Sequence, residues 1–415
     1  SGQGKAALSL LQLLGRREPR FPRRPGCGDP RSPSPEDDPA LSGRGARIAG
    51  AAPGLLDEGF ALYLADPFDR ERNPEGVLNL GTSENTLCFD LIEERVRVDI
   101  FAKESLVHFF QITVMNGCCA VFATLSTVLC DPGFAHLLHP TYTLVWCHWC
   151  PVTPKTSYWF FFFQGIRVRA LILINPHNPL GDIYPAQLLK ECLDFAHRYE
   201  LHVIMDEIYM LSVYDDITFT SVLSLESLPD PERTHFMWGF SKDFGMCGIR
   251  VGVLHTTNHE IQKAVNQLAV FHSCPGPVQH VLSQFLKDRD WMDNVFFPTN
   301  KKRLKEAQKL LVDGLADIGV PVLKSSGGLY VWADFRKFLK SQTFEAELEL
   351  WQKLLDKKLL ISPGKAFCCY EPGWFRLVFS NSLELRCFLL SQVLRDLKKC
   401  YTPMMLSQFQ TTHPH

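Results

Sequence analysis

Four short apolar segments, each followed by polar residues, constrain the fold of this chain more than any other feature. They cover residues 170–175, 202–208, 235–240 and 249–255. Apolar runs of this length are typical of strands that are buried on both faces of a sheet. We therefore expect a buried sheet in the middle of the chain.

The stretch between the first two segments has the pattern of an amphipathic helix. Pro185 suits the first turn of a helix, because the N–H group that proline lacks would have no partner there. Apolar side chains follow at helical spacing, namely Leu188, Leu189, Cys192, Phe195 and Ala196. A strand, a helix and a strand in this order form a parallel βαβ unit with a right-handed crossover. The pattern predicts an α/β fold with a doubly wound, mainly parallel sheet that binds its ligand at the carboxyl ends of the strands.

The C-terminal third has another order of elements. A helix over 301–317, a strand over 327–335, a helix over 344–358 and a strand over 374–380 predict a smaller α+β domain. The first fifty residues contain fifteen glycines and prolines and eight arginines, too little apolar surface to offset the entropy of ordering. We expect a disordered leader, a large domain, a small domain and a flexible tail, at residues 1–50, 51–300, 301–403 and 404–415.

The composition limits the classes of function. Hydrophobic residues make up 46% of the 415 residues and charged residues 21%, so a core can form. The formal net charge of −2 argues against a nucleic-acid partner. No apolar stretch reaches the roughly 18 residues of a membrane span, so no membrane partner is expected. The fourteen cysteines are scattered, as in reduced cytoplasmic proteins, and predict neither a disulfide framework nor a metal site.

Polar motifs follow three of the predicted strands. Asn178 lies in an Asn-Pro-His-Asn-Pro-Leu-Gly turn after the first strand. Asp206 and Tyr209 close the second strand, and Ser241 and Lys242 follow the third. Each motif alone also has a structural interpretation, as a turn, a helix cap or an ordinary loop. Their shared place at the carboxyl ends of neighbouring strands predicts one site.

The motifs and their spacing give the chain a family resemblance. Asp206 follows Asn178 by 28 residues, Lys242 follows Asp206 by 36, and Arg250 follows Lys242 by 8. The sequence runs that carry the resemblance are GTSENTLCFDL, NGCC, NPLG, DEIY and SKDFGMCGIRVG, at residues 81–91, 116–119, 178–181, 206–209 and 241–252. Over roughly residues 55–400 the chain resembles the fold-type I pyridoxal-phosphate (PLP) enzymes of the class I/II aminotransferase family. Within that family it is similar to the 1-aminocyclopropane-1-carboxylate (ACC) synthase-like proteins of animals.

The resemblance implies a role for each residue at the centre of the site. Lys242 would form the internal aldimine with pyridoxal 5'-phosphate. Asp206 would keep the pyridine nitrogen of the cofactor protonated, so that the ring can accept carbanion electrons. Tyr209 and Asn178 would hydrogen-bond the hydroxyl oxygen of the ring. Lys242, Asp206 and Tyr209 are therefore the expected catalytic residues.

The resemblance also implies a phosphate cradle. Arg250 and Ser241 would hold the phosphate, together with the backbone N–H groups of Cys118 and Cys119 at a helix start. Tyr142 would stack on the cofactor ring, and a core position is the alternative for this residue.

The substrate side of the site rests on two further residues. Arg376 would bind the α-carboxylate of an amino-acid substrate; an arginine with a local partner is the alternative. Glu84 would face the amine or sulfur end of the substrate, or it would be an acid in a loop. The other partners implied by the resemblance are a 2-oxo acid and a second copy of the chain in a homodimer.

Two segments depart from the family pattern and look like deletions, near residues 86–115 and 143–169. The first contains no tyrosine, although the family has one there that reaches the phosphate. The second holds an aromatic run where the family has a strand and a helix. Two functions therefore stay open. One is a PLP-dependent enzyme of the transaminase type, with ACC synthesis or carbon–sulfur lyase chemistry as variants. The other is a pseudoenzyme that keeps the fold as an interaction protein.

Overall fold

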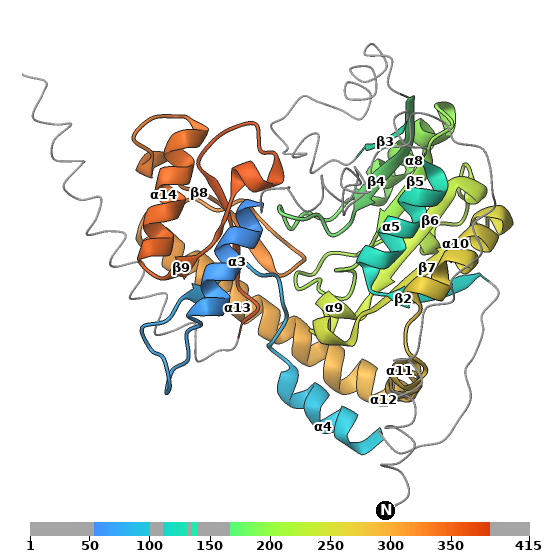
Figure 1. Cartoon of the computed structure of the whole chain (residues 1–415), viewed down its shortest axis with the longest axis horizontal. Helices are drawn as coiled ribbons and strands as arrows, with labels where there is room; N and C mark the ends of the chain where they lie inside the picture. Colours follow the sequence, from blue (N-terminus) through green and yellow to red (C-terminus); the bar gives the residue numbers. More distant parts are fainter. Residues whose placement is uncertain (1–53, 100–110, 131–134, 139–166, 382–415) are drawn as a thin grey trace, which may run out of the picture. The chain divides into compact units, whose positions relative to one another are not determined.

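The structure is a computed structural model, and it describes residues 54–99, 111–130, 135–138 and 167–381 (Figure 1). The chain divides into two units, residues 1–52 and 53–415, and all described residues belong to the second unit. The expected leader and tail, Tyr142 and most of residues 143–169 lie outside the described residues. Within the described ranges we find no helix with the length and apolar character of a membrane span.

A six-stranded sheet forms the centre of the fold, in the strand order β2-β7-β6-β5-β4-β3 (Figure 1). Its strands are β2 (Ile112–Asn116), β3 (Ala135–Leu138), β4 (Arg167–Ile174), β5 (His202–Asp206), β6 (Thr234–Gly239) and β7 (Val251–Thr256). The strands from β3 to β6 are parallel, which confirms the expected α/β sheet. β7 is antiparallel to both of its neighbours. The reason is that residues 240–250 are too few for the crossover that a parallel pair needs.

Helices cover both faces of this sheet. They are α5 (Cys118–Leu129), α8 (Ala186–Arg198) and α10 (His259–His272). Leu125 of α5 and Val265 of α10 are fully buried against one face. Leu189 of α8 is fully buried against the other face, so α8 is the helix predicted after Pro185. Each of these buried apolar side chains contributes about 2 kcal/mol relative to an exposed one. Their burial holds the helices against the two faces of the sheet.

The C-terminal part contains a second sheet, which is antiparallel and has the order β10-β11-β8. Its elements and the helices near them are α13 (Phe297–Asp317), β8 (Tyr330–Asp334), α14 (Phe344–Asp356), β10 (Ser362–Pro363) and β11 (Trp374–Val378). The helix, strand, helix and strand predicted for this part are therefore present. Arg376 of β11 lies opposite Trp332 of β8, which places both side chains on one face of the sheet. The domain boundary expected at residue 300 stays a prediction.

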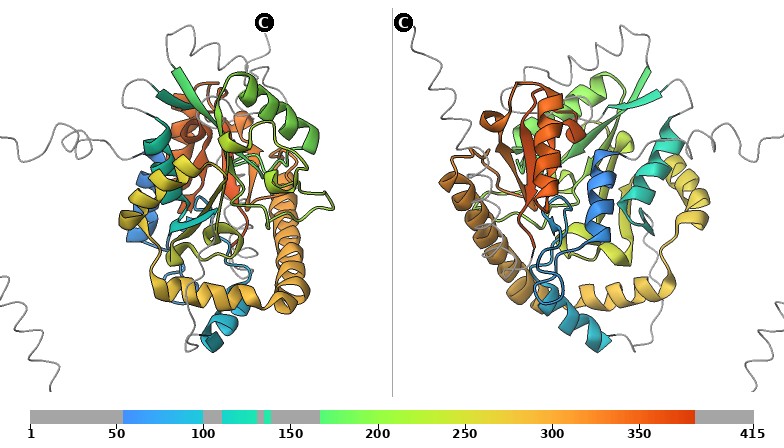
Figure 2. Two further views of the ribbon diagram at one scale, coloured as in Figure 1. Left: turned by 90° about the vertical axis from the view of Figure 1, so that its right-hand side faces the viewer. Right: turned by 60° about the vertical axis from the view of Figure 1, so that its left-hand side comes forward.

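The remaining elements are α3 (Leu55–Ala65), β1 (Leu78–Asn79), α4 (Phe89–Asp99), α11 (Gly276–Lys287), α12 (Arg289–Trp291) and β9 (Leu359–Leu360). α4 lies in the first segment that departs from the family pattern. Arg303 of α13 donates two hydrogen bonds to the carboxylate of Asp90 in α4, at 2.7 and 2.9 Å. Arg95 pairs with Asp288 at 2.9 Å, where the chain turns between α11 and α13 (Figure 2). These ion pairs fasten α4 to the rest of the fold.

Two histidines are buried near the amino ends of β5 and β6. The Nδ1 atom of His202 lies 3.0 Å from Nε2 of His235, and Nδ1 of His235 lies 2.9 Å from Oγ1 of Thr256 in β7. Burial lowers the pKa of His202 to about 4 and the pKa of His235 to about 3. Both rings are therefore neutral at pH 7, and their hydrogen bonds join three neighbouring strands.

Acidification is expected to destabilise the protein through this pair. An unfolded histidine has a pKa of about 6.5, so below about pH 6.5 the unfolded chain binds more protons than the folded chain. The free energy of unfolding then falls with pH, by up to about 1.4 kcal/mol per pH unit for each histidine. Between pH 7 and pH 5, the melting temperature should fall more steeply for the wild type than for a His202→Gln/His235→Gln double variant. The exposed His259→Gln variant is the control, and parallel curves for wild type and double variant would contradict the prediction.

Candidate functional site

Lys242 lies directly beyond the carboxyl end of β6. It belongs to α9 (Phe240–Asp243), a short helix whose N-cap, Gly239, is the last residue of the strand. Its side chain is half-buried, and Nζ donates a hydrogen bond to the carbonyl oxygen of Ser83 at 2.5 Å. The amine is thus directed at a segment of chain that lies 159 residues away in the sequence.

Asp206 and Tyr209 lie beside this lysine at the end of β5. The N–H of Ile208 donates to Oδ1 of Asp206 at 3.1 Å. Burial raises the pKa of Asp206 to about 6, although the nearby Lys242 acts in the opposite direction. The hydroxyl of Tyr209 lies 3.4 Å from Oγ of Ser83. Ser83 therefore contacts both Lys242 and Tyr209.

The start of α5 forms a cradle with Arg250. Gly117 precedes the helix with φ at +80°, and no side chain caps the first turn. A Cβ atom on Gly117 would lie 2.4 Å from Nη2 of Arg250, so only glycine lets the guanidinium come this close. Arg250 has a left-handed backbone with φ at +57°, and its Nη1 donates to the carbonyl oxygen of Cys247 at 3.0 Å. Backbone N–H groups at a helix start and an adjacent guanidinium are the donors that a phosphate requires.

Cys118 shows that the cradle and the lysine belong to one site. Its thiol interacts electrostatically with Asp206, Lys242 and Arg250, and burial raises its pKa, so it stays protonated. Cys119 follows it in the first turn of α5 and is exposed. Ser241 precedes Lys242 and is buried.

Arg376 is a buried cation on β11. It is only 6% exposed, and its Nη1 donates to Oδ1 of Asn178 at 3.0 Å. Its Nη2 donates to the carbonyl oxygen of Gly81 at 2.6 Å. The guanidinium carbon lies 5.3 Å from the centre of the Tyr330 ring and 4.7 Å from that of the Phe367 ring. Burial lowers the pKa of Arg376, because the charge is removed from water.

No carboxylate among the described side chains forms an ion pair with Arg376, and its Nε is buried without a hydrogen-bond partner. A buried cation without an anion is costly, so this guanidinium is suited to bind an incoming carboxylate. The alternative, an arginine with a local partner, stays open, because Asn178 and the carbonyl oxygen of Gly81 are such partners.

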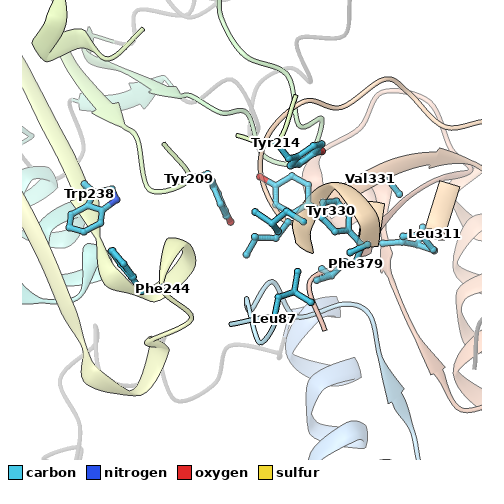
Figure 3. Close-up of a cluster of buried hydrophobic side chains, with 14 of the residues drawn as sticks. Leu87, Tyr209, Tyr214, Trp238, Phe244, Leu311, Tyr330, Val331 and Phe379 are labelled. Carbon is cyan, nitrogen blue, oxygen red and sulfur yellow. The ribbon is translucent and has the colours of Figure 1, made fainter. Parts of the chain in front are cut away.

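Tyr330 links Arg376 to the lysine side of the site. The Tyr209 ring lies edge-on to the Tyr330 ring, with their centres 5.5 Å apart (Figure 3). The carboxylate of Glu84 contacts the thiol of Cys247, which also interacts electrostatically with Lys242 and Arg250. The structure thus brings together every predicted site residue that it describes, whereas Tyr142 lies outside the described residues.

The sequence interpretation did not identify three residues that line the site. Ser83 accepts the bond from Lys242, the carbonyl of Gly81 holds Arg376, and Tyr330 stacks on the same arginine. Ser83 and Gly81 do lie in the GTSENTLCFDL run that carries the resemblance. Tyr330 had no local signal, because its position depends on how β8 packs.

Comparisons with known sequences point to one family. The family model "Aminotransferase class I and II" matches residues 163–386, more than half of the chain. The chain is 38% identical to 1-aminocyclopropane-1-carboxylate synthase-like protein 1 of Mus musculus, over 93% of this chain and 91% of the mouse protein. It is 32% identical to 1-aminocyclopropane-1-carboxylate synthase 8 of Arabidopsis thaliana, over 79% of this chain and 84% of the plant protein.

Comparison with solved structures gives the same fold. The aspartate aminotransferase of Thermus thermophilus with maleate superimposes with a TM-score of 0.66 at 19% identity, over 86% of this chain and 100% of the other. The N-succinyldiaminopimelate aminotransferase of Mycobacterium tuberculosis gives a TM-score of 0.64 at 19% identity, over 85% and 98% of the two chains. These likenesses confirm the fold that the sequence predicts.

The residues present fit the cofactor of that family, pyridoxal 5'-phosphate. The uncapped start of α5 beside Arg250 suits its phosphate, and the closeness of Gly117 to the guanidinium shapes that cradle. The amine of Lys242 suits its aldehyde, and the carboxyl group of Asp206 suits its ring nitrogen. Sequence, fold and site therefore agree that this chain belongs to the class I and II aminotransferase family.

Proposed function

We propose that the protein is a PLP-dependent enzyme of the transaminase type that acts on an amino acid. The observation that carries the proposal is the buried Arg376, which pairs with no carboxylate of the described residues and lies in one site with Lys242 and Asp206. Tyr209 and Tyr330 connect the two sides of that site. Burying an amine, a carboxyl group and a guanidinium this close together is costly, and a protein without a substrate would have no reason to keep all three.

Lys242 and Asp206 would hold the reactive part of the cofactor. The Nζ atom of Lys242 is the primary amine that would bind the aldehyde and later move a proton at the substrate. Asp206, with a pKa of about 6, is mostly ionised at neutral pH and would keep the ring nitrogen protonated. Asn178 and Tyr209 would hydrogen-bond the hydroxyl oxygen of the ring. When bound, the cofactor supplies an electron sink for negative charge at the substrate's α-carbon.

The phosphate would lie at the start of α5. Arg250 would offer its guanidinium, Ser241 its hydroxyl, and Cys118 and Cys119 their backbone N–H groups. The positive end of the helix dipole adds to this attraction. The absence of a side-chain cap on this helix supports the proposal, because these N–H groups then have no competing side-chain acceptor.

Arg376 would orient the substrate by its α-carboxylate. The hydrogen bonds to Asn178 and to the carbonyl of Gly81 fix the plane of the guanidinium. The rings of Tyr330 and Phe367 keep water away and so strengthen the ion pair with the substrate. Glu84 would face the far end of the substrate and take part in the choice between amino acids.

An absorption spectrum tests the attachment of the cofactor. Addition of PLP to the purified protein should produce a visible band that borohydride removes. Peptide mapping should then find the reduced adduct on Lys242. The Lys242→Ala variant should show no such band, whereas Lys263→Ala, at an exposed lysine of α10, should behave as wild type. A band that survives in Lys242→Ala would overturn the assignment.

The substrate carboxylate is tested with Arg376→Gln. The variant should leave the cofactor band in place, because Arg376 lies beyond Tyr209 on the substrate side. The amino-acid concentration at the midpoint of the change in the cofactor band should rise roughly 100-fold, as expected for loss of a buried charged contact. Arg336→Gln is the matched control, since Arg336 pairs with Asp334 at the surface of the same sheet. Equal effects of both substitutions would contradict the proposed role.

A pseudoenzyme is the second candidate. It stays open because a human relative is named "Probable inactive 1-aminocyclopropane-1-carboxylate synthase-like protein 2", which is 41% identical over 78% of this chain and 68% of that protein. A cofactor band that depends on Lys242 but responds to no amino acid would establish it. We also propose a homodimer in the cytoplasm, which sedimentation and cell fractionation would test.

A further inference from the structure

Asp243, the residue after Lys242, is a fully buried carboxyl group held by three donors. Its Oδ1 accepts a hydrogen bond from Oγ of Ser212 at 2.7 Å. Its Oδ2 accepts from Nε1 of Trp238 at 2.8 Å and from the N–H of Leu211 at 3.2 Å. Asp243 is 0% exposed, so its carboxyl group has no contact with bulk solvent. Every polar atom of this side chain is therefore engaged with the protein.

The donors come from different parts of the site. Trp238 belongs to β6, which leads into the lysine helix α9. Leu211 and Ser212 follow Tyr209 in the segment after β5. One side chain thus fastens the helix of Lys242 to the segment of Tyr209.

The backbone of Asp243 makes a further connection. Its carbonyl oxygen lies 3.4 Å from Nδ2 of Asn85, which also donates to Oδ1 of Asn300 at 3.0 Å. Asn85 lies two residues after Ser83, whose carbonyl accepts the hydrogen bond from Lys242. Asp243 therefore contacts three segments around the site: the end of β6, the segment after Tyr209 and the segment that contains Ser83.

The surroundings make this carboxyl group expensive to keep. The centre of the Trp238 ring lies 6.1 Å from that of the Phe244 ring (Figure 3). It lies 4.9 Å from the centre of the Phe240 ring. Burial raises the pKa of Asp243 to about 7, and the hydrogen bonds act in the opposite direction. An apolar side chain would pack here at lower cost. A role in geometry explains why a carboxyl group occupies the position.

We infer that Asp243 is a positioning residue that sets the direction of Lys242 by clamping α9 to the Tyr209 segment. The inference rests on the proposed function for its consequence, namely that Lys242 meets the cofactor at the correct angle. Small displacements of a reacting group lower reactivity strongly, so the clamp need not touch the cofactor to matter.

An asparagine at position 243 tests whether the three hydrogen bonds of the clamp, to Ser212, Trp238 and Leu211, matter without the negative charge. With its Oδ1 facing Trp238 and Leu211, an asparagine would accept both of their hydrogen bonds. Its amide would then donate to Ser212, whose hydroxyl can rotate to accept. Asp243→Asn should therefore keep the clamp, whereas Asp243→Ala removes all three bonds.

Two measurements on the full chain test the inference. Hydrogen exchange without cofactor should be faster in peptides covering 209–212 and 240–246 for Asp243→Ala, and near wild type for Asp243→Asn. In a titration with PLP that is followed by the visible band, the affinity for PLP should be at least about tenfold lower in Asp243→Ala. In Asp243→Asn it should be close to the wild-type affinity. Glu347→Ala is the matched control. Glu347 is also fully buried and accepts from the N–H groups of Lys365 and Gly373, but it lies on α14.

The outcomes separate this inference from the proposed function. If Asp243→Ala and Glu347→Ala give the same exchange at 209–212 and the same PLP affinity, the clamp is refuted. If Asp243→Ala is insoluble, Ser212→Ala and Trp238→Phe each remove one donor, and smaller changes in the same direction support the clamp. Wild-type values in both of these variants refute it. A wild-type protein without a visible band contradicts the proposed function, and hydrogen exchange alone then decides the inference.

Discussion

The contact between β7 and the start of α5 sets the spacing of the whole site. A Cβ atom on Gly252 would lie 2.4 Å from the carbonyl carbon of Gly117 and 2.5 Å from the nitrogen of Cys118. The two backbones can approach this closely only because Gly252 has no side chain. The approach brings Arg250, two residues before Gly252, against the first turn of the helix. It also brings Cys118 within electrostatic reach of Asp206 and Lys242 at the ends of the parallel strands.

Around this contact the protein buries charged groups that water would otherwise solvate. Lys242 lowers the cost of burying Asp206, since its positive charge favours the charged form of that carboxyl group. Asp243 relies on neutral donors, and Arg376 relies on Asn178, a carbonyl oxygen and two aromatic rings. Among the described residues, the lysine side therefore contains an opposite charge, Asp206, whereas the arginine side contains none. This asymmetry is what a site needs when the missing anion arrives with the substrate.

Local pattern explains which parts of this molecule could be predicted from its sequence. β4, β5, β6 and β7 are short apolar runs with polar residues at their ends, so both the strands and Asp206, Tyr209 and Lys242 were found. The direction of β7 was not predicted, because an apolar run has no mark of its orientation and only the length of 240–250 decides it. Contacts such as Lys242 with Ser83, 159 residues apart, and Arg376 with Gly81, 295 apart, depend on tertiary packing that no local pattern contains.

The two segments that depart from the family pattern, near residues 86–115 and 143–169, affect the positions of the site residues less than the length of these segments implies. Asn178 and Lys242 follow β4 and β6, and Asp206 is the last residue of β5. These three strands pair without interruption. The residues just before the first departing segment are held from elsewhere, since Asn85 bonds to Asn300 at the start of α13. Arg303, three residues further along, binds both the carbonyl of Leu87 and the carboxylate of Asp90. α13 thus fixes both Ser83 and α4, so the position of Ser83 against Lys242 does not require the rest of the segment to follow the family pattern.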